Sequence, residues 1–111
     1  ASTAQTAPDP PLVLLRLAEN YVELEYAAQR ENDSTAANVV AAARKKAIEH
    51  YRRIRNDYPA FPKLDEILYY LGYEYEKSGD LAHARAMYRQ LVKEFPSSAY
   101  VTKIPKSLAP R

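Results

Sequence analysis

The chain has 111 residues, no cysteine and a formal net charge of +2. This length suits one domain with a modest core, and the lack of cysteine excludes a disulfide framework and a thiol nucleophile. The charge is too small to indicate nucleic acid by itself, and no apolar run approaches the roughly 20 residues that span a bilayer. Two glycines among many Ala, Leu, Tyr, Arg and Glu residues predict an all-helical protein.

Residues 1–11 are small, polar and rich in proline, so we expect a flexible N-terminal segment. Such a segment often follows a cleaved leader in an exported protein. An interdomain linker has the same composition, and both interpretations stay open.

A helical pattern runs from residue 12 to about residue 29 and carries two apolar stripes. The stripe expected to face the core consists of Leu14, Leu17, Tyr21, Leu24 and Ala28. The stripe on roughly the opposite side consists of Leu12, Leu15, Val22 and Tyr26. Because a helix in a two-layer hairpin needs only one apolar face, the second stripe is expected to form an apolar end face. A second copy of the chain, another subunit or a preceding repeat would cover it.

The next helix is expected from about residue 35 to residue 57, after a turn at residues 31–34. Its apolar stripe includes Val40, Ala47 and Ile54, and its basic residues are Arg44, Lys45, Lys46, Arg52, Arg53 and Arg55. These basic residues lie mainly opposite the stripe, which favours a solvated outer face. No aromatic residue between them could stack on a base, so we expect no nucleic-acid partner.

A second helical hairpin is expected at residues 63–96, after two prolines at 59 and 62. Gly72 and Ala84 lack bulk, so the two helices can approach closely where they cross. Gly79 is expected to end the first helix in a left-handed conformation, and Asp80 is expected to cap the second.

The spacing of this hairpin resembles the tetratricopeptide repeat. The residues that carry the resemblance are Leu68-x2-Leu71-Gly72-x2-Tyr75, Ala84-x3-Tyr88 and Pro96. An earlier copy reads Leu14-x2-Leu17-Ala18-x2-Tyr21, Ala47-x3-Tyr51 and Pro59. The second helices of the two copies are 37 residues apart, but the first helices are 54 apart, so 17 extra residues lie at the tip of the first hairpin.

The resemblance implies an all-α solenoid of two helical hairpins, at residues 12–59 and 63–96 of a domain 12–98, with the first hairpin elongated. The C-terminal tail, residues 99–111, is expected to be irregular or loosely packed. Its apolar residues Ile104 and Leu108 are expected to cover the open end of the stack.

In this family, the side of the first helix that faces away from its packing stripe lines a concave groove. The expected protein-binding groove consists of Glu66, Tyr69, Tyr70, Tyr73, Glu76 and Lys77. Tyrosine suits an interface because it offers a large contact area and a hydroxyl at low entropic cost. The alternative is that Tyr69 and Tyr73 pack on the second helix of the preceding repeat.

His50 and His83 lie on different repeats without a ligand motif, and the chain has no phosphate-binding loop or nucleophile elbow. We therefore expect no enzyme, no metal and no cofactor, and predict a non-catalytic adaptor that binds another protein. The 37-residue period and the Tyr-Pro and Phe-Pro stops resemble bacterial outer-membrane-assembly lipoproteins and the periplasmic protein of the Tol–Pal system, which implies an envelope setting. The alternatives are a homodimerisation module and a cytoplasmic regulatory domain whose basic helix contacts an anionic surface.

Overall fold

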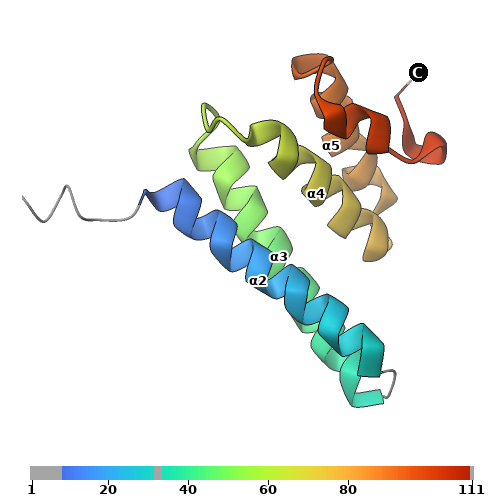
Figure 1. Ribbon diagram of the computed structural model, residues 1–111. Coiled ribbons are helices and arrows are strands. Elements are labelled where there is room, and N and C mark those ends of the chain that lie inside the picture. Colours follow the sequence, from blue (N-terminus) through green and yellow to red (C-terminus); the bar gives the residue numbers. More distant parts are fainter. Residues whose placement is uncertain (1–8, 32–33, 111) are drawn as a thin grey trace, which may run out of the picture.

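The computed structural model describes residues 9–31 and 34–110, and the secondary structure of this part is entirely helical (Figure 1). The helices are α2 (Pro10–Glu31), α3 (Ser34–Asp57), α4 (Leu64–Lys77) and α5 (Leu81–Glu94), followed by the 3-10 helices η1 (Ala99–Lys103) and η2 (Lys106–Leu108). Each α-helix packs against the next along the chain. This arrangement confirms the predicted all-α solenoid of two hairpins.

The first hairpin is longer than the second. Helices α2 and α3 have 22 and 24 residues, whereas α4 and α5 have 14 each. The extra residues add roughly 12–15 Å at a rise of 1.5 Å per residue. The tip of the α2–α3 hairpin therefore extends beyond the second hairpin (Figure 1), as the repeat spacing predicted. Of the expected turn at residues 31–34, residues 32–33 lie outside the described residues.

Helix α2 begins earlier than expected, because Pro10 and Pro11 already belong to it. Proline is compatible with the first turn of a helix, where a backbone N–H would have no intrahelical acceptor. The backbone N–H of Val13 donates to the carbonyl oxygen of Asp9 at 3.0 Å. Residues 1–8 of the expected N-terminal segment lie outside the described residues.

The second hairpin closes through the contact of Gly72 on α4 with Tyr88 on α5. A Cβ atom on Gly72 would overlap Cε1, Cδ1 and Cζ of the Tyr88 ring, so the close approach predicted at this glycine is confirmed. Gly79 adopts a positive φ of 87°, and the Asp80 carboxylate accepts a hydrogen bond from the backbone N–H of His83 at 3.2 Å. Both predicted features of the turn are therefore present.

The assignment of the two apolar stripes of α2 was wrong in part: Leu14 and Ala28 are buried and Leu12 and Tyr26 are exposed, as their stripes predicted. Leu15 and Val22, expected on an open end face, are only 4% and 7% exposed. Leu17 and Leu24, expected in the core, are 38% and 44% exposed. The reason is the rotation of α2 about its axis: the fully buried Ala18 marks the centre of its inner side, and Leu15 and Val22 lie beside it.

The tail folds back as two 3-10 helices instead of remaining irregular. Helix η1 packs on α4 and η2 on α5, and the side chains of Ile104 and Leu108 are buried in the core cluster. The hydroxyl of Ser98 donates to the Asp65 carboxylate at 2.7 Å, which ties the start of the tail to α4. The prediction that Ile104 and Leu108 cover this end of the stack is confirmed.

Candidate functional site

The residues of the expected groove follow one side of α4, because their spacing of three and four residues matches the helical period. Five of them are half-buried: Glu66, Tyr69, Tyr70, Tyr73 and Glu76. Lys77, the last residue of α4, is exposed. The structure thus brings tyrosine rings and carboxylates together along this helix.

The ring of Tyr69 has several aromatic neighbours. Its centroid lies 5.2 Å from that of Tyr70, 5.3 Å from that of Tyr100 and 6.2 Å from that of Tyr88. Tyr100 belongs to η1, and its hydroxyl donates to Oε1 of Glu66 at 3.4 Å. Burial, together with the nearby Glu66, raises the pKa of Tyr100 to about 12. Tyr100 was not among the residues expected in the groove, because the tail was expected to be irregular or loosely packed.

The tyrosines of α4 differ in their contacts with the first hairpin. The residue whose ring stacks on α3 is Tyr70, with its centroid 6.1 Å from that of Tyr51 and an interplanar angle of 12°. Tyr73 instead lies beside Tyr26 of α2, and burial together with a hydrogen bond to Tyr73 raises the pKa of Tyr26 to about 12. Tyr26, expected on the apolar end face, therefore lies next to the residues expected in the groove.

Helix α2 also contributes a carboxylate to this region. Burial raises the pKa of Glu66, and the negative charge of Glu19 on α2 adds to that effect although Lys63 opposes it. The same Glu19 charge contributes to the raised pKa of Tyr70. Within the described residues, no lysine or arginine lies within ion-pair distance of Glu19, Glu66 or Glu76. We call this surface the tyrosine–glutamate face, and it consists of Glu19, Tyr26, Glu66, Tyr69, Tyr70, Tyr73, Glu76 and Tyr100.

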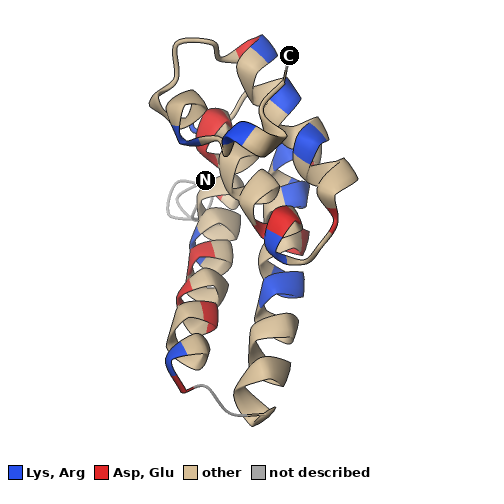
Figure 2. Ribbon diagram, turned by 90° about the vertical axis from the view of Figure 1, so that its right-hand side faces the viewer, with Lys and Arg blue, Asp and Glu red and all other residues tan. Residues whose placement is uncertain are grey.

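Charge differs between the two helices of the first hairpin, since Glu outnumbers Arg in α2 whereas Lys and Arg outnumber Asp and Glu in α3 (Figure 2). A groove of about 870 Å³ runs along α3 to the end of α4, and its walls include Lys45, Arg52 and Arg53. These three side chains are exposed, as the sequence predicted. Arg55 is different, because its Nε donates to Oε1 of Gln90 on α5 at 2.8 Å.

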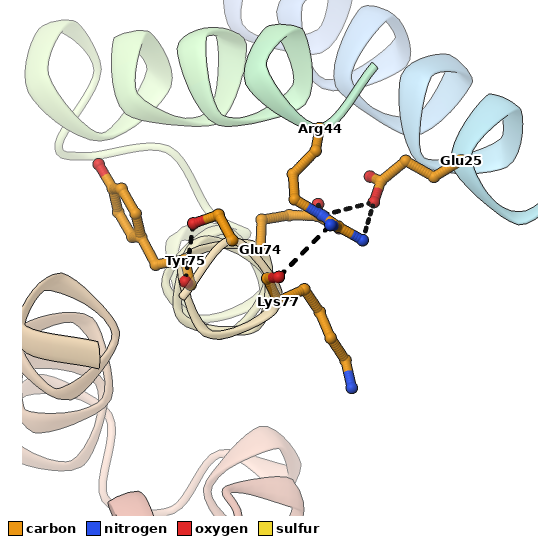
Figure 3. Close-up of polar contacts among 6 residues, drawn as sticks. Glu25, Arg44, Glu74, Tyr75 and Lys77 are labelled. Atoms are coloured by element: carbon orange, nitrogen blue, oxygen red, sulfur yellow. Dashed lines mark hydrogen bonds and ion pairs between the residues drawn. The ribbon is translucent and has the colours of Figure 1, made fainter. Parts of the chain in front are cut away.

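Arg44 also departs from the expected solvated face, since it forms a buried cluster with Glu25 and Glu74 (Figure 3). Its Nη2 lies 3.0 Å from Oε1 of Glu25, and its Nε lies 3.4 Å from Oε1 of Glu74. Burial and the neighbouring Glu25 raise the pKa of Glu74 to about 9, so Glu74 holds a proton at neutral pH. This cluster links α2, α3 and α4, and it could not be predicted from the sequence because its members are 19 to 49 positions apart.

The two histidines have structural partners in different repeats. The His50 ring stacks on Tyr21 with centroids 5.7 Å apart, and His83 stacks on Tyr75 at 5.0 Å. In the part of the chain that the structure describes, no group of three or more His, Cys, Asp and Glu side chains could hold a metal ion. None of the helices described is long and apolar enough to cross a membrane.

Comparison with known proteins agrees with this architecture. Residues 66–98, which include most of α4 and all of α5, match the family model of the tetratricopeptide repeat. Comparisons with curated proteins and with solved structures gave no match. Tetratricopeptide repeats are in general non-catalytic modules that bind other proteins. The match identifies one tetratricopeptide repeat at residues 66–98, and such a repeat suggests a role in protein–protein interaction.

Proposed function

We propose that the chain is a non-catalytic adaptor that holds a cationic segment of another protein on its tyrosine–glutamate face. The observation that carries this proposal is the combination of partly exposed tyrosine rings with carboxylates that have no Lys or Arg within ion-pair distance among the described residues. Burial raises the pKa of Glu66 on α4, and the negative charge of Glu19 on α2 adds to this effect. A lysine or arginine between them would remove this repulsion and form charge-assisted hydrogen bonds.

The tyrosines of this face already lie beside cations of the chain itself. Nζ of Lys77 is 5.4 Å from the centroid of the Tyr73 ring, and Nζ of Lys103 is 5.1 Å from that of Tyr100. These distances are within the roughly 6 Å over which an ammonium group is attracted to a ring face. Each such contact is worth about 0.5–1 kcal/mol at an exposed site. The rings are therefore suited to an incoming lysine or arginine side chain.

The test is a fluorescence anisotropy titration with two labelled peptides of equal length, one of alternating Arg and Ser and one of alternating Glu and Ser. The native chain is expected to bind the Arg peptide, and binding should weaken as salt is added. The combined change Glu19→Gln and Glu66→Gln is expected to weaken binding roughly tenfold, since each exposed charge contact is worth about 0.2–1 kcal/mol.

The matched control is the combined change Glu49→Gln and Glu94→Gln, which alters the net charge equally at exposed positions away from the face. It is expected to leave binding of the Arg peptide nearly unchanged. Equal losses in both double variants would mean that only net charge matters, and the assigned face would be wrong.

The alternative of an anionic partner is supported by Lys45, Arg52 and Arg53, which are exposed along the groove beside α3. Two carboxylates partly offset this charge, since Glu49 pairs with Lys46 at 3.7 Å and Asp57 with Arg53 at 3.6 Å. If the native chain binds the Glu peptide and the Arg52→Gln and Arg53→Gln changes abolish that binding, the anionic partner would be favoured over the cationic segment.

For the setting, we propose assembly of a bacterial cell-envelope complex in the periplasm. The support is the 37-residue spacing of Ala47, Tyr51 and Pro59 from their counterparts, with the Tyr-Pro and Phe-Pro stops. Fractionation of source cells that carry the tagged full-length protein tests this setting. Recovery in the cytoplasmic fraction would contradict it and favour the cytoplasmic regulatory role.

A further inference from the structure

An apolar strip with exposed large side chains runs along one side of α2. Its large residues Val13, Leu17 and Leu24 are 38%, 38% and 44% exposed. With Asn20 and Ala27 they follow a spacing of four and three residues, which is the pattern by which two helices pack side by side. We call these five residues the outer strip of α2. It differs from the apolar end face expected from the sequence, because Leu15 and Val22 point into the core.

Charged residues line one edge of the outer strip at intervals of seven. They are Asp9, directly before α2, and Arg16, Glu23 and Arg30 on α2, and their signs alternate along the chain. All four are exposed, and none forms an ion pair with another described residue. A partner surface that complements this edge must carry charges that alternate in the opposite order, so that each residue of the edge faces an opposite charge.

The complement of this edge is the same edge running in the opposite direction. When two copies of α2 pack antiparallel, Arg16 of one copy lies opposite Glu23 of the other, and Asp9 lies opposite Arg30. Each pair occurs twice because the arrangement is twofold symmetric. A parallel arrangement would set this edge against the side of α2 that carries Tyr21 and Ala28, which have no charge. The charges therefore select the antiparallel orientation.

The same register brings the apolar residues of the two strips together. Leu17 and Leu24 of one copy lie against Asn20 and Val13 of the other, near the twofold axis. A single polar residue within such a helix interface commonly fixes register and partner number at some cost in stability. The side-chain amide of Asn20 offers both a donor and an acceptor, so it can pair with its symmetry mate.

We infer that the chain forms a homodimer in which the outer strips of two α2 helices pack antiparallel. The tyrosine–glutamate face contacts α2 through Glu19 and Tyr26, which belong to neither the outer strip nor its charged edge. The dimer therefore presents two such faces, and a partner with two cationic segments gains avidity. This inference does not depend on the proposed ligand of that face.

The first experiment measures the dimer dissociation constant by sedimentation equilibrium with the full chain. Leu17→Glu and Leu24→Glu together are expected to give a folded monomer. The control is Leu81→Glu, at a leucine that is similarly exposed but lies on α5, and it should remain a dimer. Circular dichroism checks that the helices are retained. A native chain that stays monomeric, or a double variant that dimerises as well as the native chain, would overturn the inference.

The second experiment tests the orientation through charge reversal at exposed positions that do not threaten folding. Arg16→Glu and Glu23→Arg are each expected to weaken dimerisation roughly tenfold, because each places two like-charged pairs at the interface. The two changes combined in one chain should restore it. An equimolar mixture of the two single variants should form the heterodimer in preference to either homodimer. A dimer that is weakened by the single changes but not restored by their combination would contradict antiparallel packing.

The absence of native cysteine allows a direct check of the same geometry. A mixture of Arg16→Cys and Glu23→Cys chains is expected to form a disulfide-linked heterodimer under mild oxidation. Arg16→Cys alone should crosslink much more slowly, since the two copies of position 16 lie far from each other in the antiparallel dimer. A mixture that crosslinks no faster than Arg16→Cys alone would contradict the antiparallel dimer.

Discussion

Arg44 of α3 lies 3.0 Å from Glu25 of α2, and this ion pair is almost completely removed from solvent on the side of Glu25. A second carboxylate, Glu74 of α4, lies 3.4 Å from the same guanidinium. One positive charge thus faces two buried carboxyl groups. Among the residues that the structure describes, the second oxygen of Glu25 and both oxygens of Glu74 have no hydrogen-bond partner. A proton on Glu74 resolves this imbalance, because a neutral carboxyl group can donate to a neighbouring carboxylate.

The first prediction concerns pH. The pKa of Glu74 is raised to about 9 in the folded chain, above its ordinary value near 4.5. The folded state therefore binds more protons than the unfolded state between these values, so the free energy of unfolding should fall as pH rises from about 5 to 9. The slope is at most roughly 1.4 kcal/mol per pH unit for a single group.

Urea unfolding of the native chain, measured at several pH values, checks this slope. Glu74→Gln mimics the protonated carboxyl group and should remove most of the pH dependence. Glu94→Gln, at an exposed position on α5, should leave it in place. A native chain whose stability is constant from pH 5 to 9 would show that Glu74 is ionised in the folded state.

The second prediction concerns the cation of the cluster. Arg44→Met should destabilise the chain by roughly 3–5 kcal/mol, because it leaves buried carboxyl groups without a countercharge. Adding Glu25→Gln and Glu74→Gln to this variant should recover much of the loss, since no buried charge then remains. Chemical denaturation at neutral pH measures both effects. A triple variant that is no more stable than Arg44→Met alone would point to lost packing of the arginine stem.

The third prediction concerns why glycine is required at positions 72 and 79, for which the structure gives two different reasons. Gly72→Ala should destabilise by roughly 1–3 kcal/mol, because the new methyl group overlaps the Tyr88 ring in a packed core. Gly79→Ala meets open space, so its expected loss of roughly 1–2 kcal/mol comes only from the positive φ of 87°.

A second-site change distinguishes these causes. Gly72→Ala should destabilise the Tyr88→Leu variant less than it destabilises the native chain, because Tyr88→Leu removes the ring that the new methyl group meets. Tyr88→Leu should leave the effect of Gly79→Ala unchanged. Double-mutant cycles from urea unfolding give both coupling energies, and a zero coupling between positions 72 and 88 would argue against the overlap.

The fourth prediction concerns the tail. Leu108 is buried against α5, so Leu108→Ala should destabilise by roughly 2 kcal/mol or more. Lys106→Ala, at an exposed position of the same 3-10 helix, should have little effect on thermal or urea unfolding. Equal stability of the two variants would mean that the tail does not contribute to the core in solution.

The amino-acid sequence alone determined the repeat architecture of this protein. The close packing at Gly72, the left-handed turn at Gly79 and the extra length of the first hairpin all followed from spacing along the chain. These features are local or periodic, so each can be derived from a short stretch and its counterpart one repeat away.

Only the tertiary structure decided which side of α2 faces the core. Both sides of α2 carry apolar residues such as leucine and tyrosine. The helical period shows which of these residues share a side, but it does not determine how the helix is rotated against α3. The structure likewise brought Tyr100 of the tail to Tyr69 and placed Arg44 between Glu25 and Glu74. These contacts join residues that are distant in the sequence. Burial and hydrogen bonding stabilise them only once the helices have packed, so they cannot be predicted from a local sequence pattern.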